Sequence, residues 1–523
     1  MRCLWMSGVS LATCVVLFQH GCGFDSMPEG TGSGSTGDAS SGEAQTSAPG
    51  SSGASGEVSS GGSESSSGEG PWLPPGPWDE GWEIPPFEQI PGDADAGWWA
   101  MLNEGYVSCG IPYSLFETAR PFLGEMGQGE TLPGREGPNA NVPYYWTVHR
   151  SDNGVDIASP NCLECHAGKW NGELVIGLGR ADADFTEPLG EGLEGFEIPD
   201  LPIPGIEELT EFVERAAVVA PYARTKTVGS NPADMFAVVL ASHRDPETLE
   251  WLSEPHTELP QYSLPIDTPP WWRVKKKNGL FYNGMARGDH RGTMMFASSL
   301  CTDTKAEMEA ILSYFNNINA FIRSIEAPEY PFAVDEALLD EGEAVFTANC
   351  AGCHGTYGET DDEDTYPNLL LPLPLVGTDP LMANAASMLP TFVDWWDASP
   401  YGATTDIEVD TPWPGYTAPP LDGIWATAPF LHNGSVPTME LLLDSTKRPT
   451  YWRRVDYDST NFDQDAMGWP YIELEQGAEG MAPEDAKHVF DASLIGHWNT
   501  GHTFGDHLEG SQRRALIEYL KTL

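Results

Sequence analysis

The sequence predicts a mainly α fold with long irregular loops and little sheet, preceded by a disordered tether. Residues 23–70 are dominated by Gly, Ser, Glu and Thr and have too little apolar surface to fold. Residues 71–97 are rich in Pro and Trp, which predicts an irregular segment. Further on, apolar residues recur with helical spacing. The clearest case is the stretch 304–325, with Met308, Ile311, Leu312, Phe315, Ile318, Phe321, Ile322 and Ile325.

Length and charge limit the class of protein. A chain of 523 residues is long enough for two or three domains. Its 78 acidic and 26 basic residues give a formal net charge of −52. This charge argues against nucleic acids and anionic membrane surfaces as partners, because both attract positive charge. It suits either a cationic redox partner protein or an acidic surface without a partner.

The N-terminus predicts export. Residues 1–22 contain Arg2 and then an apolar run that is too short to be a stable membrane anchor, as in a signal peptide. Gly21-Cys22 looks like a lipoprotein cleavage site, with Cys22 as the lipidated residue. Cys14 has a better local match but too short an apolar run before it. Ordinary secretion is the alternative, so we expect an outer-membrane or cell-surface lipoprotein, or a periplasmic or secreted protein.

Two folded domains are expected after the tether. The first is assigned to residues 71–328, and the second to residues 329–523. Helices are predicted at 206–220, 232–242, 246–252 and 304–325 in the first domain, and at 334–348 and 512–523 in the second. The last helix is amphipathic and is expected to pack across the helix at 334–348.

A short motif occurs once in each predicted domain. It reads Cys-x-x-Cys-His, at 162–166 and again at 350–354. This is the attachment signature of haem c, in which two thiols add to the porphyrin vinyl groups and the histidine binds the iron. The alternative is a zinc site or a disulfide at each cysteine pair, but a histidine directly follows both pairs and no second Cys-x-x-Cys pair completes a zinc site. The sequence therefore predicts two covalently bound haem c groups and two cytochrome c-like domains.

The haem motifs assign specific residues. Thiols at Cys162 and Cys165, and at Cys350 and Cys353, would hold the two haems. Proximal iron ligands would be His166 and His354. We find no Rossmann, P-loop or hydrolase motif, and no internal repeat beyond these pentapeptides.

The remaining cysteines and the distal haem ligands are left open. Cys109 and Cys301 would form either a disulfide or two buried thiols. A protein ligand on the distal face of a haem favours electron transfer, and an open face permits O2 or peroxide chemistry. Distal candidates for the second haem are His432, His502, Met382 and Met388.

Aromatic residues precede a cationic run at 269–282, which is unusual in so acidic a chain. One interpretation is an apolar distal wall for the first haem, with Arg273 or a lysine pairing the haem propionates. Trp271 and Trp272 would also suit electron transfer between the haems. The alternative is a packed surface loop with solvated lysines.

Three stretches beyond the haem motifs resemble a known family. They are 268–278, 419–438 and 501–505. Together they look like the di-haem oxygenases typified by bacterial rubber oxygenase, a branch of the di-haem cytochrome c peroxidase and MauG superfamily. The resemblance covers roughly residues 95–523. The stretch 419–438 is shared with the peroxidases, and the tryptophan–lysine stretch at 268–278 points to the oxygenase branch.

The resemblance implies different roles for the two haems. The first would be reactive, with His166 as its only protein ligand and O2 or H2O2 on the other face. Trp271, Trp272 and Phe281 would line that pocket as catalytic residues. The second would be six-coordinate and would transfer electrons.

The second haem would have His354 as proximal ligand. A Gly-His near the C-terminus supplies the distal ligand in the oxygenases, which matches His502, with His432 as the alternative. Otherwise His432 would be a conformational or hydrogen-bonding residue near the haems. The peroxidase relatives bind Ca²⁺ between the domains, so Ca²⁺ is a candidate cofactor, although no loop here has a recognisable calcium spacing.

The sequence thus predicts an exported di-haem c-type cytochrome oxidoreductase that acts on an unknown apolar or reducing substrate. An alternative is an electron-transfer cytochrome with both haems six-coordinate, which would need a sixth ligand such as Met285, His290, Met294 or Met295 at the first haem. A third is a cell-surface binding protein with structural haems. The tether and lipid anchor depart from a freely secreted polymer-cleaving enzyme, so the substrate stays open.

Overall fold

A computed structural model describes residues 81–523, except 123–126, 128, 188–202, 258, 261, 263, 359 and 406–410. Helical residues outnumber strand residues in this part, in broad agreement with the mainly α prediction. The predicted signal peptide (1–22) and tether (23–70) lie outside the described residues. Among the helices that are described, none has the length and apolar character needed to cross a membrane.

The part of the chain up to residue 328 combines short strands with four longer helices. Its helices are α2 (Ala94–Asn103), α3 (Tyr113–Ala119), α4 (Leu163–His166), α5 (Ile206–Val219), α6 (Ala233–Ser242), α7 (His290–Met294) and α8 (Lys305–Ser324). Its strands are β1 (Trp82–Glu83), β2 (Ile111–Pro112), β3 (Trp146–Arg150), β4 (Asp156–Pro160), β5 (Ala167–Trp170), β6 (Glu173–Ile176), β7 (Gly279–Leu280) and β8 (Ala286–Arg287). Except for β1, these strands form small antiparallel sheets in the orders β2-β4-β3, β5-β6 and β7-β8.

The part after residue 328 has the same character. Its helices are α9 (Leu339–Asn349), α10 (Ala351–His354), α11 (Leu373–Val376), α12 (Pro380–Ala383), α13 (Ala385–Met388), α14 (Pro390–Ala398), α15 (Pro400–Thr405), α16 (Met439–Leu442), α17 (Pro483–Ala486) and α18 (Gly510–Leu520). Its strands are β9 (Leu369–Pro372), β10 (Gly415–Thr417), β11 (Tyr451–Arg454), β12 (Tyr471–Glu473) and β13 (Phe490–Asp491). Most of the chain between these elements is irregular.

Three of the predicted helices form close to their expected bounds: α5, α6 and α8. Helix α8 begins at a capping box, in which the Thr304 side chain accepts from the amide of Glu307 and the Glu307 carboxylate accepts from the amide of Thr304. Its apolar face, including Met308 and Phe315, is buried and packs beside α2. The apolar periodicity and the capping residues both indicate a helix here, so the prediction was accurate.

The helix predicted at 246–252 is wrong. The Asp245 side chain accepts from the amides of Glu247 and Thr248 and closes a local turn. Leu249 then adopts a left-handed φ of 68°, which ends any helical run. Arg244 and Trp251 pair as an isolated antiparallel bridge instead.

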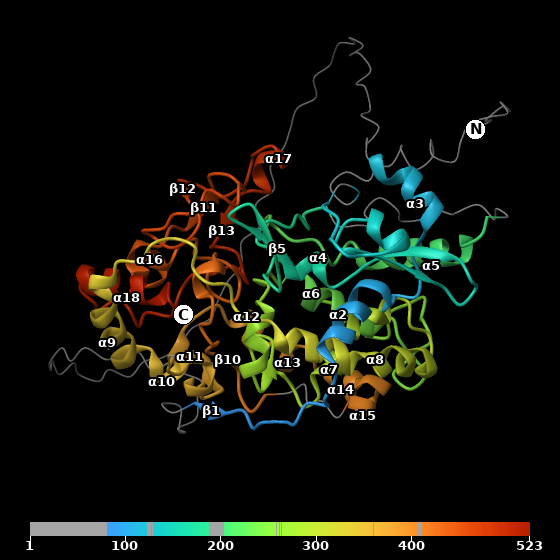
Figure 1. Ribbon diagram of the computed structural model, residues 1–523, viewed down its shortest axis with the longest axis horizontal. Coiled ribbons are helices and arrows are strands. Elements are labelled where there is room, and N and C mark those ends of the chain that lie inside the picture. The colour runs from blue at the N-terminus through green and yellow to red at the C-terminus, as the bar shows by residue number, and fades with distance from the viewer. Residues whose placement is uncertain are drawn as a thin grey trace, which may run out of the picture.

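The helices on either side of the second haem motif cross as predicted. Helix α9 starts later than the predicted residue 334, because the Asp335 side chain caps a short 3-10 turn before it. Helix α18 lies across α9, as Figure 1 shows. Gly342 makes the close approach possible, since a Cβ atom there would lie 2.2 Å from the carbonyl oxygen of Ala515.

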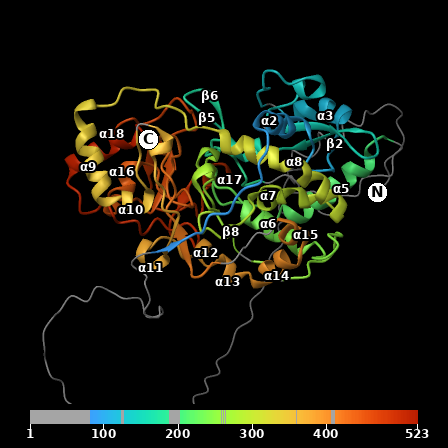
Figure 2. The ribbon, with the colours of Figure 1, turned by 60° about the horizontal axis from the view of Figure 1, so that its bottom comes forward.

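Chain segments cross between the parts before and after residue 328. Strand β1 pairs with β9 in the sheet β1-β9-β10, with Trp82 opposite Leu370. Helices α14 and α15 pack against α6, α7 and α8, as Figures 1 and 2 show from two directions. The predicted boundary at residue 328 stays a prediction, and these crossings join the two parts firmly.

Each of the two larger hydrophobic cores also contains residues from both parts of the chain. The first core is built mostly from residues before 328, but it also contains Trp395, Trp396 and Tyr401. The second is built mostly from residues after 328, but it also contains Trp170, Leu178 and Trp272. Each part therefore contributes large apolar side chains to the core of the other.

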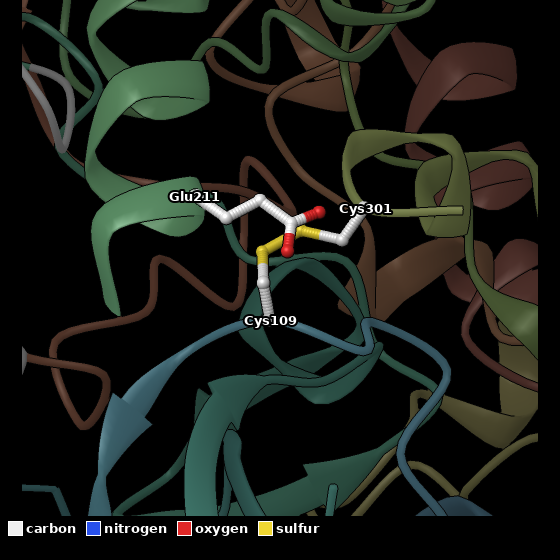
Figure 3. Close-up of side chains that lie close together, drawn as sticks. All are labelled: Cys109, Glu211 and Cys301. Carbon is white, nitrogen blue, oxygen red and sulfur yellow. A yellow bond between two sulfur atoms is a disulfide. The ribbon is translucent and has the colours of Figure 1, made fainter. Parts of the chain in front are cut away.

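The structure resolves the open question about Cys109 and Cys301. They form a disulfide that joins the chain before β2 to the segment before α8, across 192 residues. Figure 3 shows the carboxylate of Glu211, from α5, against the two sulfurs. Burial raises the pKa of Glu211 to about 7. Because both sulfurs are used in the disulfide, this group offers no thiolate to a metal ion.

We predict that Gly342→Ala destabilises the protein by about 1–3 kcal/mol, because the added methyl group overpacks the crossing of α9 and α18. Thermal unfolding of the whole protein measures the effect. Gly510→Ala is the matched control, since a Cβ atom at Gly510 meets nothing within 4 Å. Equal stability of Gly342→Ala and the wild type would contradict this account of the crossing.

Candidate haem sites

The second haem motif lies where α9 turns into the single-turn helix α10. The amides of Cys353 and His354 both donate to the carbonyl oxygen of Cys350, at 3.1 and 3.0 Å. One helical turn therefore separates the two thiols, which lie on the same side of the turn. Both thiols are free and half-buried. This arrangement suits attachment to one edge of a porphyrin.

The imidazole of His354 is fixed by a single carbonyl group. Its Nδ1 lies 2.8 Å from the carbonyl oxygen of Pro419. A carbonyl oxygen only accepts, so Nδ1 must donate the proton and Nε2 keeps its lone pair. Burial lowers the pKa of His354 despite the opposing effect of this carbonyl, and nearby Arg273 adds to the fall. A neutral imidazole fixed through one nitrogen is the form that binds metal ions.

His502 faces His354. Their ring centres are 6.3 Å apart and the rings are inclined at 59°. Two imidazoles that bind one metal ion from opposite sides, at about 2 Å each, have ring centres about 6 Å apart. Burial, together with smaller effects of His354 and Arg448, lowers the pKa of His502 to about 3. The pair therefore has the spacing and the neutral state that two axial ligands of one haem iron require.

The alternative His432 is already engaged. Its Nε2 lies 3.1 Å from the hydroxyl of Tyr416, and the two rings stack at 4.3 Å. The Tyr416 hydroxyl donates its only proton to the carbonyl of Asp379 at 2.5 Å, so Nε2 of His432 must be the donor in this contact. The geometry thus favours a hydrogen-bonding role for His432.

The two methionine candidates lie in different surroundings. Met382 is fully buried in a small apolar cluster that includes Tyr416. Met388 is 44% exposed at the end of α13. Neither has the face-to-face relation with His354 that His502 shows.

The first haem motif also forms one tight turn. It follows strand β4, and the amides of Cys165 and His166 donate to the carbonyl of Cys162 at 3.4 and 3.2 Å. Burial raises the pKa of the Cys162 thiol to about 12 and that of Cys165 to about 11. Tyr106 lies against Cys162, and Asn231 lies against Cys165.

His166 packs against Trp271. The two rings are stacked, with centres 4.8 Å apart and an angle of 22° between the planes. Burial lowers the pKa of His166 to about 4. The carbonyl of Pro269 faces the imidazole and opposes this fall, although Nδ1 itself does not reach hydrogen-bond geometry. His166 is therefore neutral, like His354.

The other two predicted pocket residues lie elsewhere. Trp272 is fully buried in the second core, and its indole N–H donates to the carbonyl of Asp422 at 2.8 Å. Phe281 is half-buried, with a left-handed φ of 62°, and packs beside the first core. The prediction that Trp271, Trp272 and Phe281 line one reactive pocket stays a prediction. Adjacent tryptophans contact the two different cores.

Possible sixth ligands of the first haem differ in how free they are. The Met285 sulfur accepts from the side-chain amide of Asn283 at 3.4 Å. Met295 is fully buried in the first core, and Met294 packs at its edge. His290 is buried, and the backbone of Asn278 faces its ring without reaching good hydrogen-bond geometry at either nitrogen. His290 is thus the candidate with uncommitted donor atoms.

The structure corrects the statement that no internal repeat exists beyond the haem motifs. The same offset of 150 positions relates Pro269-Pro270 to Pro419-Pro420, and Asn283-Gly284 to Asn433-Gly434. Both Asn-Gly pairs form the same turn. Gly284 and Gly434 donate to the carbonyls of the residues three positions earlier, at 3.3 and 3.1 Å. This shared spacing is the signal that the sequence contained.

The backbone of the two repeats agrees in detail. Phe281 and Leu431, at matching positions, have left-handed φ values of 62° and 67°. The asparagine side chains accept from the amides of Met285 and Ser435, at 3.2 and 3.3 Å. Such conformations are rare for large residues, so their recurrence at one offset marks a repeated structural unit.

The two repeats also exchange hydrogen bonds. The amide of Asp267 donates to the carbonyl of His432 at 2.8 Å, and the amide of Thr417 donates to the carbonyl of Tyr282 at 2.7 Å. Asp267 and Thr417 are 150 positions apart, and so are Tyr282 and His432, so the two bonds join equivalent positions of the two repeats. The rings of Tyr282 and His432 meet edge to face, 6.3 Å apart. The two repeats therefore meet in a pseudo-symmetric crossover between the two haem motifs.

The cationic run 273–277 is not a solvated loop. Arg273 is buried and donates to the carbonyl of Asp422 at 3.0 Å. Lys276 pairs with both Asp364 and Asp422. Lys277 has a pKa lowered to about 8 by burial and by Arg273. Arg273 thus places a positive charge on the side of His354, whereas the charge of Lys277 acts on His290.

A single arginine holds the loop that carries His502. The guanidinium of Arg448 donates to five carbonyl oxygens, those of Leu441, Leu442, Asn499, Gly501 and His502. The loop needs this support because Gly501 and His502 have left-handed φ values of 73° and 45°. The amide of His502 also donates to the carbonyl of Val376 at 2.7 Å. Sequence reasoning missed Arg448, since no motif marks it.

One segment matches a known family. Residues 415–453 match the family described as "RoxA-like, cytochrome c-like". The matched segment includes Pro419, His432 and Arg448. The match supports a haem cytochrome of the RoxA type, with haem c and a redox function. It covers a short part of the chain.

Two proteins of Sinorhizobium fredii (strain NBRC 101917 / NGR234) are similar over longer stretches. The uncharacterized protein y4iJ is 30% identical over 294 residues, which are 44% of this chain and 47% of that protein. The uncharacterized protein y4iM is 27% identical over 315 residues, which are 51% of this chain and 66% of that protein. The match thus spans about half the length of the first relative and somewhat under two thirds of the second.

We predict that Arg448→Met loosens His502. With haem attached to the motif at 350–354, a loss of about 1.4 kcal/mol in ligation raises the high-spin fraction of that haem about tenfold. Electron paramagnetic resonance and visible absorption measure this fraction. Arg514→Met is the control, because Arg514 is exposed and its ion pair with Asp465 is 3.7 Å long. An unchanged spin state in Arg448→Met would sink the positioning role.

Proposed function

We propose that this protein is an exported di-haem c-type cytochrome oxidoreductase of the oxygenase or peroxidase kind. Residues at the first haem motif create a site for O2 or H2O2, and residues at the second create an electron-transfer site. The observation that carries the proposal is the difference between the two motifs. His354 faces a second histidine at 6.3 Å, whereas His166 is stacked on Trp271.

The residues of the second site fit a haem c with two axial histidines. Cys350 and Cys353 would attach it, and His354 and His502 would bind its iron from opposite faces. Two protein ligands leave no open position, which favours electron transfer. Arg273 supplies positive charge on this side, which suits the haem propionates.

The residues of the first site fit a haem c with one firmly placed ligand. Cys162 and Cys165 would attach it, and His166 would bind its iron through Nε2. Haem c there supplies an iron couple and, where its sixth position is open, binding of O2 or peroxide. Trp271 holds the plane of His166 by stacking, and the buried surroundings exclude water from the imidazole.

One observation favours the alternative of an electron-transfer cytochrome with both haems six-coordinate. His290 is buried, and neither ring nitrogen reaches good hydrogen-bond geometry, although the backbone of Asn278 faces the ring. Burial lowers its pKa to about 4, so the ring is neutral and has a free lone pair. A neutral, uncommitted imidazole is a suitable sixth ligand.

Substrate and partners follow from the same features. The substrate is proposed to be apolar or reducing, and its identity stays open. The net charge of −52 suits a cationic redox partner protein and disfavours nucleic acid. We also propose that the only membrane attachment is a lipid on Cys22, which makes the protein an outer-membrane or cell-surface lipoprotein. We also propose a bound Ca²⁺, which calcium analysis of purified protein tests.

We predict two covalent haems of different spin state. Mass spectrometry of the mature protein should find two haems, and Cys162→Ala or Cys350→Ala should each lose one. In a titration with H2O2, followed by visible absorption and electron paramagnetic resonance, one high-spin haem should react beside one low-spin haem. His502→Ala should convert the low-spin haem to high spin.

The controls separate the alternatives. His432→Ala should leave the second haem low-spin, because His432 bonds to Tyr416 instead of facing His354. Two unreactive low-spin haems would replace the proposal with the electron carrier, and His290→Ala should then free the first haem. Fewer than two haems would end the di-haem interpretation.

We predict that Cys22→Ala abolishes incorporation of a labelled fatty acid and releases the protein from the membrane fraction. Two acyl chains anchor a protein stably, whereas a soluble protein has no such affinity. Cys14→Ala is the matched control and should retain the label. Membrane association of unlabelled Cys22→Ala would contradict anchoring by lipid alone.

A further inference from the structure

Tyr282 lies at the crossover between the two repeats and connects to both haem motifs. Its carbonyl accepts from the amide of Thr417 at 2.7 Å. Two residues after Thr417, the carbonyl of Pro419 binds the proximal histidine of the second motif at 2.8 Å. A short path of covalent bonds and hydrogen bonds therefore links the backbone of Tyr282 to His354.

The side chain of Tyr282 leads to the other motif. Its hydroxyl donates to Oδ2 of Asp267 at 2.9 Å. Two residues after Asp267, the carbonyl of Pro269 faces His166. The phenol–carboxylate pair thus lies on a path of covalent bonds and hydrogen bonds that starts at His354 and ends at the carbonyl of Pro269, which faces His166.

The second repeat lacks this pair, although its backbone is the same. The positions that match Tyr282 and Asp267 are His432 and Thr417. There the imidazole bonds to the Tyr416 hydroxyl, and no carboxylate takes the place of Asp267. The repeated backbone therefore does not require a phenol and a carboxylate. A sheltered carboxylate is costly, and burial raises its pKa. Here it accepts a hydrogen bond from the phenol of Tyr282 at 2.9 Å.

Oxidation of a phenol is a task that needs such a partner. Removal of one electron makes the phenolic proton strongly acidic, and it leaves only if an acceptor lies within hydrogen-bond distance. Asp267 is at that distance. Its pKa is raised to about 8 by burial, against the effects of Tyr282 and Arg273. An acceptor with a pKa near the working pH can both take the proton and return it.

We propose that Tyr282 is a redox-active residue that passes single electrons between the two haem sites, while Asp267 holds its phenolic proton. This inference rests on the proposed di-haem function. When Tyr282 gives up one electron, its O–H bond breaks and the proton moves to Asp267. The electron would go to the haem that Cys162, Cys165 and His166 would hold, and peroxide would be the oxidant there. The tyrosyl radical then takes back one electron and the proton from Asp267, which restores the phenol and the carboxylate. The reduced haem that His354 and His502 would hold would supply that electron.

The test uses the full di-haem protein with the second haem reduced. One equivalent of H2O2 is added, and the sample is frozen at successive times for electron paramagnetic resonance. Wild-type protein should show a transient tyrosyl radical, and stopped-flow absorption should show oxidation of the low-spin haem as the radical decays. Tyr282→Phe should lose the radical and slow oxidation of the low-spin haem at least about tenfold, which is about 1.4 kcal/mol in the barrier.

Two further variants separate chemistry from structure. Asp267→Asn keeps a hydrogen-bond acceptor but not a base, so it should also slow the electron transfer, and it carries the test if Tyr282→Phe does not fold. Tyr366→Phe is the matched control, because the Tyr366 hydroxyl donates only to the carbonyl of Ala418, at 2.5 Å. It should retain both the radical and the rate.

The failures of the two proposals can be distinguished. If the first haem reacts with peroxide but Tyr282→Phe and Asp267→Asn behave as wild type, only the tyrosine proposal is overturned. If the first haem of wild-type protein reacts with neither peroxide nor O2, the proposed function fails and the tyrosine proposal falls with it.

Discussion

The hydrogen bond from His354 to the carbonyl of Pro419 joins the helix that ends in the haem motif to a loop far along the chain. The direction of this carbonyl is well defined, because a residue before a proline is restricted to extended backbone and Pro420 follows. The bond fixes the imidazole tautomer and leaves Nε2 for a metal. It also sets where an opposing ligand must be, and His502 lies there.

The same proline pair occurs at Pro269-Pro270, where the first carbonyl faces His166. One structural device thus serves two sites, and the sites differ in what surrounds it. Near the second, Arg448 holds a strained loop that delivers His502. Near the first, Trp271 stacks on the imidazole itself. The asymmetry between the sites therefore comes from residues around the repeated unit, while the unit itself is common to both.

Local patterns predicted the parts of the fold that local interactions decide. Helix α8 has both a periodic apolar face and a capping box, and the haem motifs define their own turns, so the sequence was sufficient for them. The helix at 246–252 failed because the Asp245 side chain captured the backbone amides. Tertiary packing brings His354 and His502 face to face although they are 148 positions apart, and no local sequence pattern predicts such a contact. The offset of 150 residues is visible in the sequence, but only the matching backbone angles show that it marks a repeated structural unit.

The disulfide between Cys109 and Cys301 has a consequence for how the protein is made. Its two cysteines enclose Cys162 and Cys165 in the sequence, so an oxidising environment offers Cys109 nearer partners than its native one. The haem thiols must stay reduced until the porphyrin is attached, whereas Cys109 and Cys301 must lose their protons and electrons. On the proposed function, maturation would therefore have an order: haem attachment at Cys162 and Cys165 would remove the competing thiols and leave Cys109 and Cys301 as the pair within that part of the chain.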